Sequence, residues 1–229
     1  GVHGTYTLEE TGGKAICIYC GQCANVCPVD SITERDESAQ VKKAIADPEK
    51  IVVVSTSPAV RAALGEEFGM EPGAFVEGKM VALLRALGAD YVLDTNFAAD
   101  LTIMEEATEF IDRLTHRDDY QWPMFTSCCP GWVRFVKSNF PDMTDNLSTA
   151  KSPQQMFGAV AKSYFAKSIG VDPHNIRMIS IMPCVAKKEE CSLEPMRDAC
   201  GDPDVDIVLT TREFTRMVRS DNIQIDEIP

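Results

Sequence analysis

The amino-acid sequence predicts an α/β fold, in which a mostly parallel sheet with flanking helices follows a small cysteine-rich module. From residue 51 onward, short apolar runs rich in β-branched residues alternate with longer stretches of helical periodicity. Strands that are separated in this way by helices pair in parallel. The first part of the chain instead holds four closely spaced cysteines. We therefore expect a module with its connector over residues 1–45 and an α/β domain over residues 46–229.

Each expected element rests on its own run of residues. Apolar, β-branched runs predict strands at Ile51–Val54, Tyr91–Leu93, Met124–Thr126, Met178–Ile181 and Val205–Leu209. Helical periodicity predicts helices near 58–67, 77–87, 99–114, 131–139, 153–168 and 211–219, with a short helix over Val41–Ala46 in the connector.

Three segments with unusual residues begin where a predicted strand ends. They are Ser55–Ala59, Ser127–Trp132 and Met182–Glu190. Ligands of open α/β sheets bind at the carboxyl ends of the strands. The sequence therefore predicts that these segments converge on one site, although they lie far apart along the chain.

Composition limits the kinds of protein that this chain can be. It has 229 residues, of which 45% are apolar, and a net charge of −13. A nucleic-acid-binding protein needs a basic face, so we expect no nucleic acid among the partners. No apolar run approaches the ~18 residues of a membrane span, and no secretory signal opens the chain, so we expect a cytoplasmic protein. Nine cysteines in such a chain favour metal ligation over disulfides and indicate a reducing, anaerobic setting.

The four cysteines of the N-terminal module have the spacing of an iron–sulfur site. Cys17, Cys20, Cys23 and Cys27 form the run C-x₂-C-x₂-C-x₃-C-P, which is the bacterial ferredoxin signature for a [4Fe–4S] cluster. Gly21 permits the tight turn between them. Zinc is the weaker interpretation, because zinc sites favour separated cysteine pairs. Since only one such motif is present, Cys27 either closes this cluster or serves a second cluster whose motif lies upstream.

A second group of cysteines follows two of the predicted strands. Cys128 and Cys129 are adjacent, and Cys184 lies in the segment Met182–Glu190. Adjacent cysteines cannot easily ligate the same face of a cubane, so we expect Cys128 and Cys129 to have different roles. A proline follows Cys129 and another precedes Cys184, which restricts the backbone beside both. The alternative is that all three are buried core thiols, a common role of free cysteine.

These two segments resemble the first and second signature motifs of the catalytic domain of [FeFe]-hydrogenases. Residues 126–132 have the sequence TSCCPGW, and residues 182–190 have the sequence MPCVAKKEE, which fits the form MPCxxKxxE. Asp100–Glu109 and Asn146–Gln155 are also similar to that family, as is the order of a ferredoxin-like module before Val52–Leu64. The resemblance covers essentially the whole chain.

The resemblance implies a hydrogenase, an enzyme that interconverts protons and H₂ at an H-cluster. This cofactor is a [4Fe–4S] cluster joined to a di-iron subsite with CO, CN and a bridging dithiolate. The resemblance implies that Cys129 and Cys184 are thiolate ligands of the [4Fe–4S] part, and that Cys128 relays a proton to the subsite. Lys187 would hold a cyanide ligand through a charge-assisted hydrogen bond. The residues that would line the di-iron pocket are Met182, Pro183, Pro58 and Gln154.

A proton path follows partly from spacing and partly from the resemblance. Glu106, Glu109 and Arg113 stand at i, i+3 and i+7, so they share one face of the predicted helix over 99–114. On spacing alone, a solvated helix face is the better interpretation. Together with Ser148 and Cys128, however, these residues resemble the family's route from the surface to the active site.

The chain also departs from the family's pattern. The third motif, FGxTGG, and the final C-x₃-C are not found before Pro229. That C-x₃-C supplies the other two thiolates of the cubane, and Cys191 and Cys200 do not match it, so we expect both to be incidental thiols. We therefore expect a second polypeptide, or a missing C-terminal half, to complete the H-cluster. Ala59 stands where many relatives have serine, and Glu189 stands where an aromatic residue is usual.

Partners and competing functions follow from the same resemblance. It implies a ferredoxin or a similar electron carrier, and the hydrogenase maturation proteins. The main alternative is a NARF-like iron–sulfur assembly or electron-transfer protein, which shares this architecture without the di-iron subsite. Such proteins usually lack the first cysteine of the pair, whereas Cys128 is present here. An H₂ sensor and an inert electron-transferring subunit are further alternatives. His174, like the other histidines, has no ligand partner at metal spacing in the sequence and is expected to be a surface residue.

Overall fold

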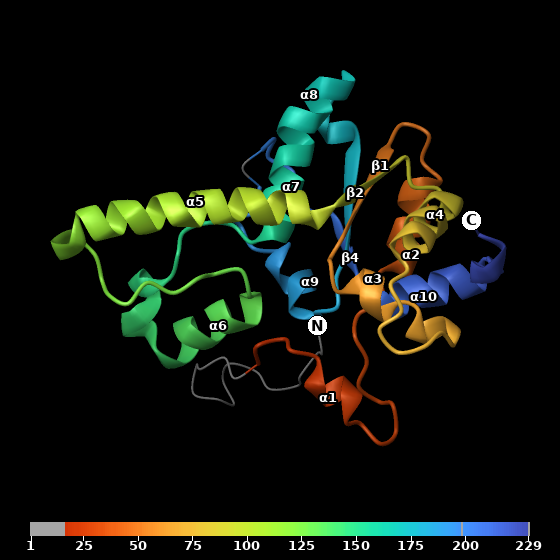
Figure 1. The fold of residues 1–229 in the computed structure, drawn as a ribbon, viewed down its shortest axis with the longest axis horizontal. Coiled ribbons are helices and arrows are strands. Elements are labelled where there is room, and N and C mark those ends of the chain that lie inside the picture. The colour runs from red at the N-terminus through yellow and green to blue at the C-terminus, as the bar shows by residue number, and fades with distance from the viewer. Residues whose placement is uncertain (1–16, 198, 229) are drawn as a thin grey trace.

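A four-stranded, all-parallel sheet forms the centre of the molecule (Figure 1). The computed structural model describes residues 17–197 and 199–228. The strand order is β2-β1-β3-β4. The strands are β1 (Ile51–Thr56), β2 (Tyr91–Asp94), β3 (Ile176–Ile181) and β4 (Ile207–Leu209). The predicted α/β fold with a parallel sheet is confirmed. The predicted boundary between residues 45 and 46 stays a prediction.

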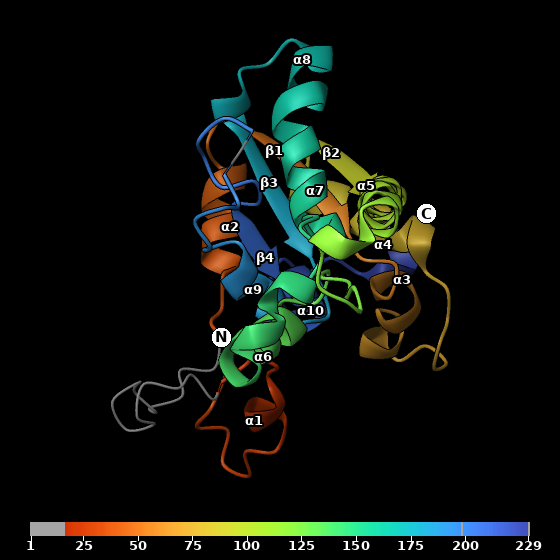
Figure 2. The same ribbon diagram turned by 90° about the vertical axis from the view of Figure 1, so that its left-hand side faces the viewer.

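Helices connect the strands and cover both faces of the sheet (Figures 1 and 2). They are α1 (Gln22–Asn25), α2 (Ser38–Ile45), α3 (Val60–Ala63), α4 (Glu77–Leu87), α5 (Thr95–Thr115), α6 (Pro130–Asn139), α7 (Pro153–Val160), α8 (Ala166–Ile169), α9 (Ala186–Glu190) and α10 (Thr211–Ser220). A π-helical turn, Ala161–Phe165, joins α7 to α8, so the helix predicted over 153–168 is continuous. The helix predicted over 58–67 is instead divided into α3 and a 3-10 turn, Glu66–Phe68.

The predicted strand Met124–Thr126 is wrong, because it does not join the sheet. Phe125 forms an isolated parallel bridge with Leu147. Its N–H donates to the Asn146 carbonyl at 2.7 Å, and its own carbonyl accepts from the Ser148 N–H at 2.7 Å. The segment has the β-propensity of a strand, but its backbone groups pair with residues 146–148 outside the four strands. Tertiary context has overridden local propensity here.

Alternating strand residues build two separate apolar cores. On one face, Val52 and Val54 of β1 pack with helices α2, α4 and α10. On the other face, Val53 packs with residues of α5, α7 and the π-helical turn. Successive strand side chains point to opposite faces, so a sheet that is covered on both sides needs apolar residues at nearly every position. This explains the unbroken apolar runs of β1 over residues 51–54 and of β4.

The strand order places a switch point between β1 and β3. The chain moves from β1 to β2 on one side and then crosses to β3 on the other side. Thr56 and Ile181, the last residues of β1 and β3, are direct partners, and the Ser57 N–H donates to the Ile181 carbonyl at 3.0 Å. Pro58 and Cys184 therefore follow neighbouring strand ends at this point, where ligands bind in open α/β sheets. The expected convergence of these two segments is confirmed.

The buried ammonium group of Lys188 connects four elements of the fold. Lys188 of α9 is 3% exposed, and its Nζ lies 3.1 Å from the Glu37 carboxylate and 3.0 Å from the Glu213 carboxylate. It also donates to the carbonyl of Val208 in β4. Glu37 precedes α2, and Glu213 lies in the first turn of α10, where it forms a capping box with Thr210. One side chain thus ties α9 to α2, α10 and β4.

Removal of this ammonium should cost much of the stability of the fold. We expect Lys188→Met to lower the free energy of unfolding by about 3–5 kcal/mol, because two buried carboxylates lose their cation. Urea denaturation of the reduced chain, followed by circular dichroism, measures the change. Lys43→Met on the exposed side of α2 is the matched control, and it should alter stability by less than about 0.5 kcal/mol. Equal losses in the two variants would contradict the assigned role of Lys188.

Candidate functional site

The cysteines of the second group lie at the ends of two elements that meet near the switch point. Cys129 is the N-cap residue of α6, and the Trp132 N–H donates to its Sγ at 3.5 Å. Cys184 lies between the end of β3 and the start of α9. Cys128 and Cys129 are exposed, and Cys184 is half-buried. The alternative of three buried core thiols is therefore wrong, because none of these three cysteines is buried.

Lys187 joins the two cysteine segments. Its Nζ donates to the Cys128 carbonyl at 2.8 Å and pairs with the Glu190 carboxylate at 3.0 Å. Gln154 of α7 donates through Nε2 to the Lys187 carbonyl and to Glu190, at 3.2 Å in both cases. These contacts bring Cys128 and Lys187 together, although the two residues are 59 positions apart in the sequence. Lys187 and Glu190 both belong to the short helix α9, which Lys188 connects to Glu37 and Glu213.

The other predicted pocket residues surround the same strand ends. Met182 is buried, and its N–H donates to the carbonyl of Leu209, the last residue of β4, at 2.8 Å. Pro58 and Pro183 are exposed just beyond β1 and β3. The Oε1 atom of Gln154 is buried and has no hydrogen-bond partner within the described residues. It is therefore an acceptor that remains available at this site.

Three of the residues predicted for the proton path form one network. Arg113 donates to Glu109 Oε1 from Nε at 2.9 Å and from Nη2 at 2.6 Å, and the Ser148 hydroxyl donates to Glu109 Oε2 at 2.8 Å. Burial tends to raise the pKa of Glu109, but the hydrogen bonds from Ser148, Arg113 and the Thr149 N–H outweigh it and hold the pKa below its usual 4.5. Hydrogen bonds from three residues thus fix the position of the Glu109 carboxylate.

Two further members of the predicted path are not joined to this network by hydrogen bonds. Glu106 lies on α5 one turn before Glu109, and its Oε1 is buried without a partner in the part of the chain that is described. Cys128 is exposed, and its contact with Lys187 is made through its backbone carbonyl. The structure therefore brings Glu109, Arg113 and Ser148 together and leaves Glu106 and Cys128 as separate groups.

The four N-terminal cysteines lie on a tight loop around α1. Gly21 caps this helix with φ 79°, in the left-handed region that favours glycine. The Tyr19 N–H donates to Cys17 Sγ at 3.4 Å, and Cys27 Sγ lies 3.4 Å from the Ser31 hydroxyl.

These sulfurs suit an iron–sulfur cluster. Hydrogen bonds from Ser31 and from the N–H groups of Val29 and Ile32 lower the pKa of Cys27 to about 7. Cys17, Cys20 and Cys23 are exposed. Cluster ligands are thiolates whose sulfurs accept such hydrogen bonds, so the donor set fits a [4Fe–4S] cluster. The same holds for Cys129, whose sulfur accepts an N–H at the start of α6.

Cys191 has a role that the sequence analysis missed. It accepts hydrogen bonds from Gln154 Nε2 at 3.3 Å and Gln155 Nε2 at 3.2 Å, and its Sγ donates to the Lys187 carbonyl at 3.2 Å. Burial raises the pKa of its thiol to about 12. Cys191 is therefore a neutral thiol that supports the helix turn beneath Lys187. Its i+4 spacing from Lys187 was the available signal.

His174 also has neighbours that the sequence did not reveal. Its imidazole Nδ1 lies 2.9 Å from the Asp202 carboxylate, and the ligand atoms of His174, Asp202 and Cys200 all lie within 4.8 Å of one another. His174 lies at the surface, as expected, but the structure places beside it a carboxylate and a thiol that the spacing in the sequence did not indicate. The side chains of His174 and Asp202 are 59% and 37% exposed, so this contact is a surface ion pair when the imidazole is protonated.

None of the helices in the described ranges 17–197 and 199–228 is long and apolar enough to cross a membrane.

Comparison with known families covers nearly the whole chain. Residues 50–229 match the family described as the iron only hydrogenase large subunit, C-terminal domain, and residues 14–33 match the 4Fe-4S binding domain. The 4Fe-4S match includes the four N-terminal cysteines. The hydrogenase match includes Cys128, Cys129 and Cys184 as well as the Glu109 network.

Three relatives illustrate the range of similar proteins. The NADP-reducing hydrogenase subunit HndD of Solidesulfovibrio fructosivorans is 52% identical over 97% of this chain. The solved apo [FeFe]-hydrogenase HydA1 of Chlamydomonas reinhardtii, a single-residue variant, is 40% identical over 85% of this chain, with a TM-score of 0.79. The cytosolic iron-sulfur assembly component 3 of Bos taurus is 32% identical over 93% of this chain.

The chain spans only part of each relative: 38% of the Solidesulfovibrio subunit, 50% of the Chlamydomonas chain and 46% of the bovine protein. The family match nevertheless extends over most of the present sequence. It includes the segments that contain Cys128, Cys129 and Cys184, and the 4Fe-4S match includes the cysteine loop before them. This chain therefore belongs to the iron-only hydrogenase large-subunit family and carries a 4Fe-4S binding module before its hydrogenase domain.

Proposed function

We propose that this chain is part of an [FeFe]-hydrogenase and that it supplies one accessory [4Fe–4S] cluster and half of the ligands of an H-cluster. The observation that carries the proposal is the contact of Lys187 with Cys128, which joins the two cysteine segments beside the β1–β3 switch point. When bound, the H-cluster supplies the di-iron centre at which 2H⁺ + 2e⁻ ⇌ H₂ takes place. Cys129 and Cys184 would be its thiolate ligands from this chain.

Lys187 and Gln154 retain hydrogen-bonding capacity for the cofactor. An ammonium group has three N–H donors. Among the described residues, the Cys128 carbonyl and the Glu190 carboxylate accept two of those of Lys187, so a third would serve an acceptor such as a cyanide nitrogen. Gln154 offers the buried, unpartnered Oε1. Together with Met182, Pro183 and Pro58, these groups would line the di-iron pocket.

Glu109, Ser148 and Arg113 would conduct protons from the surface. A cavity of about 400 Å³ borders Glu109 and includes Thr149 and Lys151 in its lining. Water that enters this cavity would reach the Glu109 carboxylate, and the Ser148 hydroxyl, which donates to that carboxylate at 2.8 Å, would exchange a proton with it. Arg113 holds Glu109 in place through two hydrogen bonds. Glu106 and Cys128 would carry the proton onward, and Cys128 Sγ would deliver it to the cofactor.

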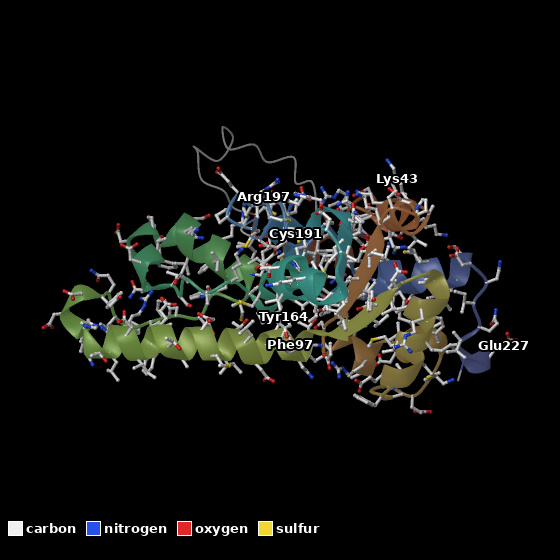
Figure 3. The ribbon with its side chains drawn as sticks, turned by 90° about the horizontal axis from the view of Figure 1, so that it is seen from above. Lys43, Phe97, Tyr164, Cys191, Arg197 and Glu227 are labelled. Atoms are coloured by element: carbon white, nitrogen blue, oxygen red, sulfur yellow. The ribbon has the colours of Figure 1, made fainter. Side chains whose placement is uncertain are left out.

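An exposed apolar stripe on α5 supports completion of the site by a further segment or subunit. Phe97, Met104 and Ile111 repeat every seven residues, which places them on one side of the helix, and their exposed fractions are 58%, 65% and 62%. Figure 3 shows α5 along one edge of the molecule, with Phe97 and Tyr164 labelled near its start. We propose that the further segment or subunit packs on this stripe, because exposed apolar patches are typical of interaction surfaces.

The accessory cluster would serve a cytoplasmic electron carrier of the ferredoxin type, and the hydrogenase maturation proteins would install the di-iron subsite. The similar Solidesulfovibrio protein is a subunit of an NADP-reducing hydrogenase. We propose that this chain likewise works within a larger assembly, in which a segment with FGxTGG and C-x₃-C supplies the other two thiolates.

The second candidate function is iron–sulfur assembly or electron transfer without a di-iron subsite. The bovine assembly component, which matches 93% of this chain, favours it. The Cys128 thiol and the Glu109–Ser148 network favour catalysis instead, since a protein without the di-iron subsite has no use for a proton path. Infrared spectroscopy distinguishes the two functions, because only the di-iron subsite carries CO and CN ligands.

Anaerobically matured protein, assembled with the segment that carries C-x₃-C, should show CO and CN stretching bands. We expect Cys129→Ser to abolish these bands, because the cubane loses a thiolate ligand. Cys200→Ser is the matched control and should retain them. Iron–sulfur absorption without CO and CN bands in the unaltered protein would support the assembly function and remove the hydrogenase proposal.

Cys128 should be needed for turnover but not for cofactor binding. We expect Cys128→Ala to keep the CO and CN bands and to lower H₂ evolution by roughly 10²–10⁴-fold, which is the usual contribution of a proton-transfer group. The assay uses a chemically reduced electron carrier, so that electron supply is not limiting. Loss of the bands in this variant would instead assign Cys128 to cofactor binding.

Glu109 should contribute both to proton transfer and to acid stability. We expect Glu109→Gln to lower H₂ evolution by roughly 10²-fold, whereas Glu105→Gln, an exposed neighbour on the same cavity, should have little effect. The depressed pKa of Glu109 stabilises the fold at pH values above 4.5, and this stabilisation is lost as the pH falls through the folded-state pKa. The urea midpoint of the unaltered chain should therefore fall more steeply on acidification than that of Glu109→Gln. Equal pH dependence would contradict this role.

A further inference from the structure

The loop that holds the N-terminal cysteines is in close contact with both halves of the second cysteine site. A Cβ added to Gly131, two residues after Cys129, would lie 3.3 Å from the Ile18 carbonyl oxygen. A Cβ added to Gly21 would lie 3.0 Å from Val185, the residue after Cys184. Figures 1 and 2 both show α1 at the end of the molecule where α6 lies. Glycine at these two positions lets the cysteine loop approach the hydrogenase domain closely.

Arg134 of α6 connects the cysteine loop with α9. Its Nε donates to the Cys17 carbonyl at 2.7 Å, and its Cζ lies 4.6 Å from the centroid of the Tyr19 ring. Its Nη1 lies 3.5 Å from the carboxylate of Glu189 in α9. The guanidinium of this α6 residue therefore contacts both the cysteine loop and α9. Cys129 immediately precedes α6, and Cys184 precedes α9.

The Arg134 side chain also supports an unusual backbone beside a cluster ligand. Tyr19 has φ 57°, a left-handed conformation that is uncommon for residues other than glycine. This conformation directs the Tyr19 N–H to Cys17 Sγ at 3.4 Å. Cation–π contact with the ring and the hydrogen bond to Cys17 hold this turn in place. Hydrogen bonds to the sulfurs and nearby charges set the reduction potential of an iron–sulfur cluster. Arg134 would act in both ways, because it supports the turn that directs the Tyr19 N–H to Cys17 and because it carries a positive charge.

We propose that Arg134 is a positioning residue for electron transfer, which holds the N-terminal cluster against the second cysteine site and raises its reduction potential. The inference rests on the proposed function, since it takes Cys17, Cys20, Cys23 and Cys27 as cluster ligands. A positive charge favours the reduced cluster, which carries one more electron. Glu189 partly offsets that charge, because it pairs with the same guanidinium.

The proposal predicts potential shifts of opposite sign for the two partners. Arg134→Gln removes the cation and should move the midpoint potential of the N-terminal cluster to more negative values. Glu189→Gln leaves the cation uncompensated and should move the potential to more positive values. Arg134→Lys keeps the charge but not the planar fork, so its potential should stay closest to that of the unaltered protein. The measurement is an anaerobic redox titration of the full chain, reconstituted with iron and sulfide and followed by electron paramagnetic resonance.

Hydrogen exchange tests the positioning role separately. Loss of a charged hydrogen bond should raise the opening of residues 17–27 by about tenfold in Arg134→Gln. The matched control is Arg212→Gln, which removes a different arginine contact with the loop, to Asn25 Oδ1 at 3.2 Å. It should leave the hydrogen exchange around Cys17 nearly unchanged, because its contact is with Asn25. Circular dichroism of each variant verifies that the domain is folded.

The outcomes separate this inference from the proposed function. A reduced-cluster signal whose potential is the same in all four variants would overturn the role of Arg134 and leave the cluster assignment intact. Shifts of the same sign in Arg134→Gln and Glu189→Gln would also overturn it, because they would reflect general loosening. Absence of any reduced [4Fe–4S] signal in the unaltered protein would overturn the cluster assignment and this inference together.

Discussion

The arrangement of this molecule depends on one buried ammonium group. Lys188 lies between the carboxylates of Glu37 and Glu213 and donates to the end of the sheet at Val208. A buried charge is tolerated only when it is paired and hydrogen-bonded, so its contacts restrict where α9 can lie. The residue before it in the sequence is Lys187, whose ammonium group joins the two cysteine segments. Lys188, which connects the surrounding elements, and Lys187, which contacts the Cys128 segment, thus occupy adjacent positions of one short helix.

The sheet topology determines where that helix begins. Because β1 and β3 are neighbours although they are distant in sequence, their carboxyl ends meet at a switch point. Pro58 and Cys184 follow these two ends, and α6 brings Cys129 to the same region through the contact of Lys187 with Cys128. The buried thiol of Cys191 and the amides of Gln154 and Gln155 support this geometry from within. Hydrogen-bonded side chains behind α9 therefore support the segments that carry the exposed cysteines.

Membership of the iron-only hydrogenase family and the proposed catalysis rest on different observations. The family follows from the match over residues 50–229. A cytosolic iron–sulfur assembly protein is also similar to this chain, over 93% of its length. The case for catalysis depends on the chemical groups themselves: an exposed Cys128, an ammonium with a donor to spare, and a carboxylate held between Arg113 and Ser148. Arg134 joins the cysteine loop, for which we propose a cluster, to the helix that follows Cys129.

The sequence by itself determined the cluster motif, the parallel α/β fold and the helix face shared by Glu109 and Arg113, because spacing and periodicity are local properties of the chain. It also indicated that Ser55–Ala59 and Met182–Glu190 would meet, since the carboxyl ends of parallel strands lie at one edge. Only the tertiary structure decided that Phe125 pairs with Leu147 outside the sheet, that Cys191 supports Lys187, and that Arg134 contacts Cys17 across 117 positions. Such contacts depend on which surfaces pack together, and pairing between distant residues leaves no periodic signal in a single sequence.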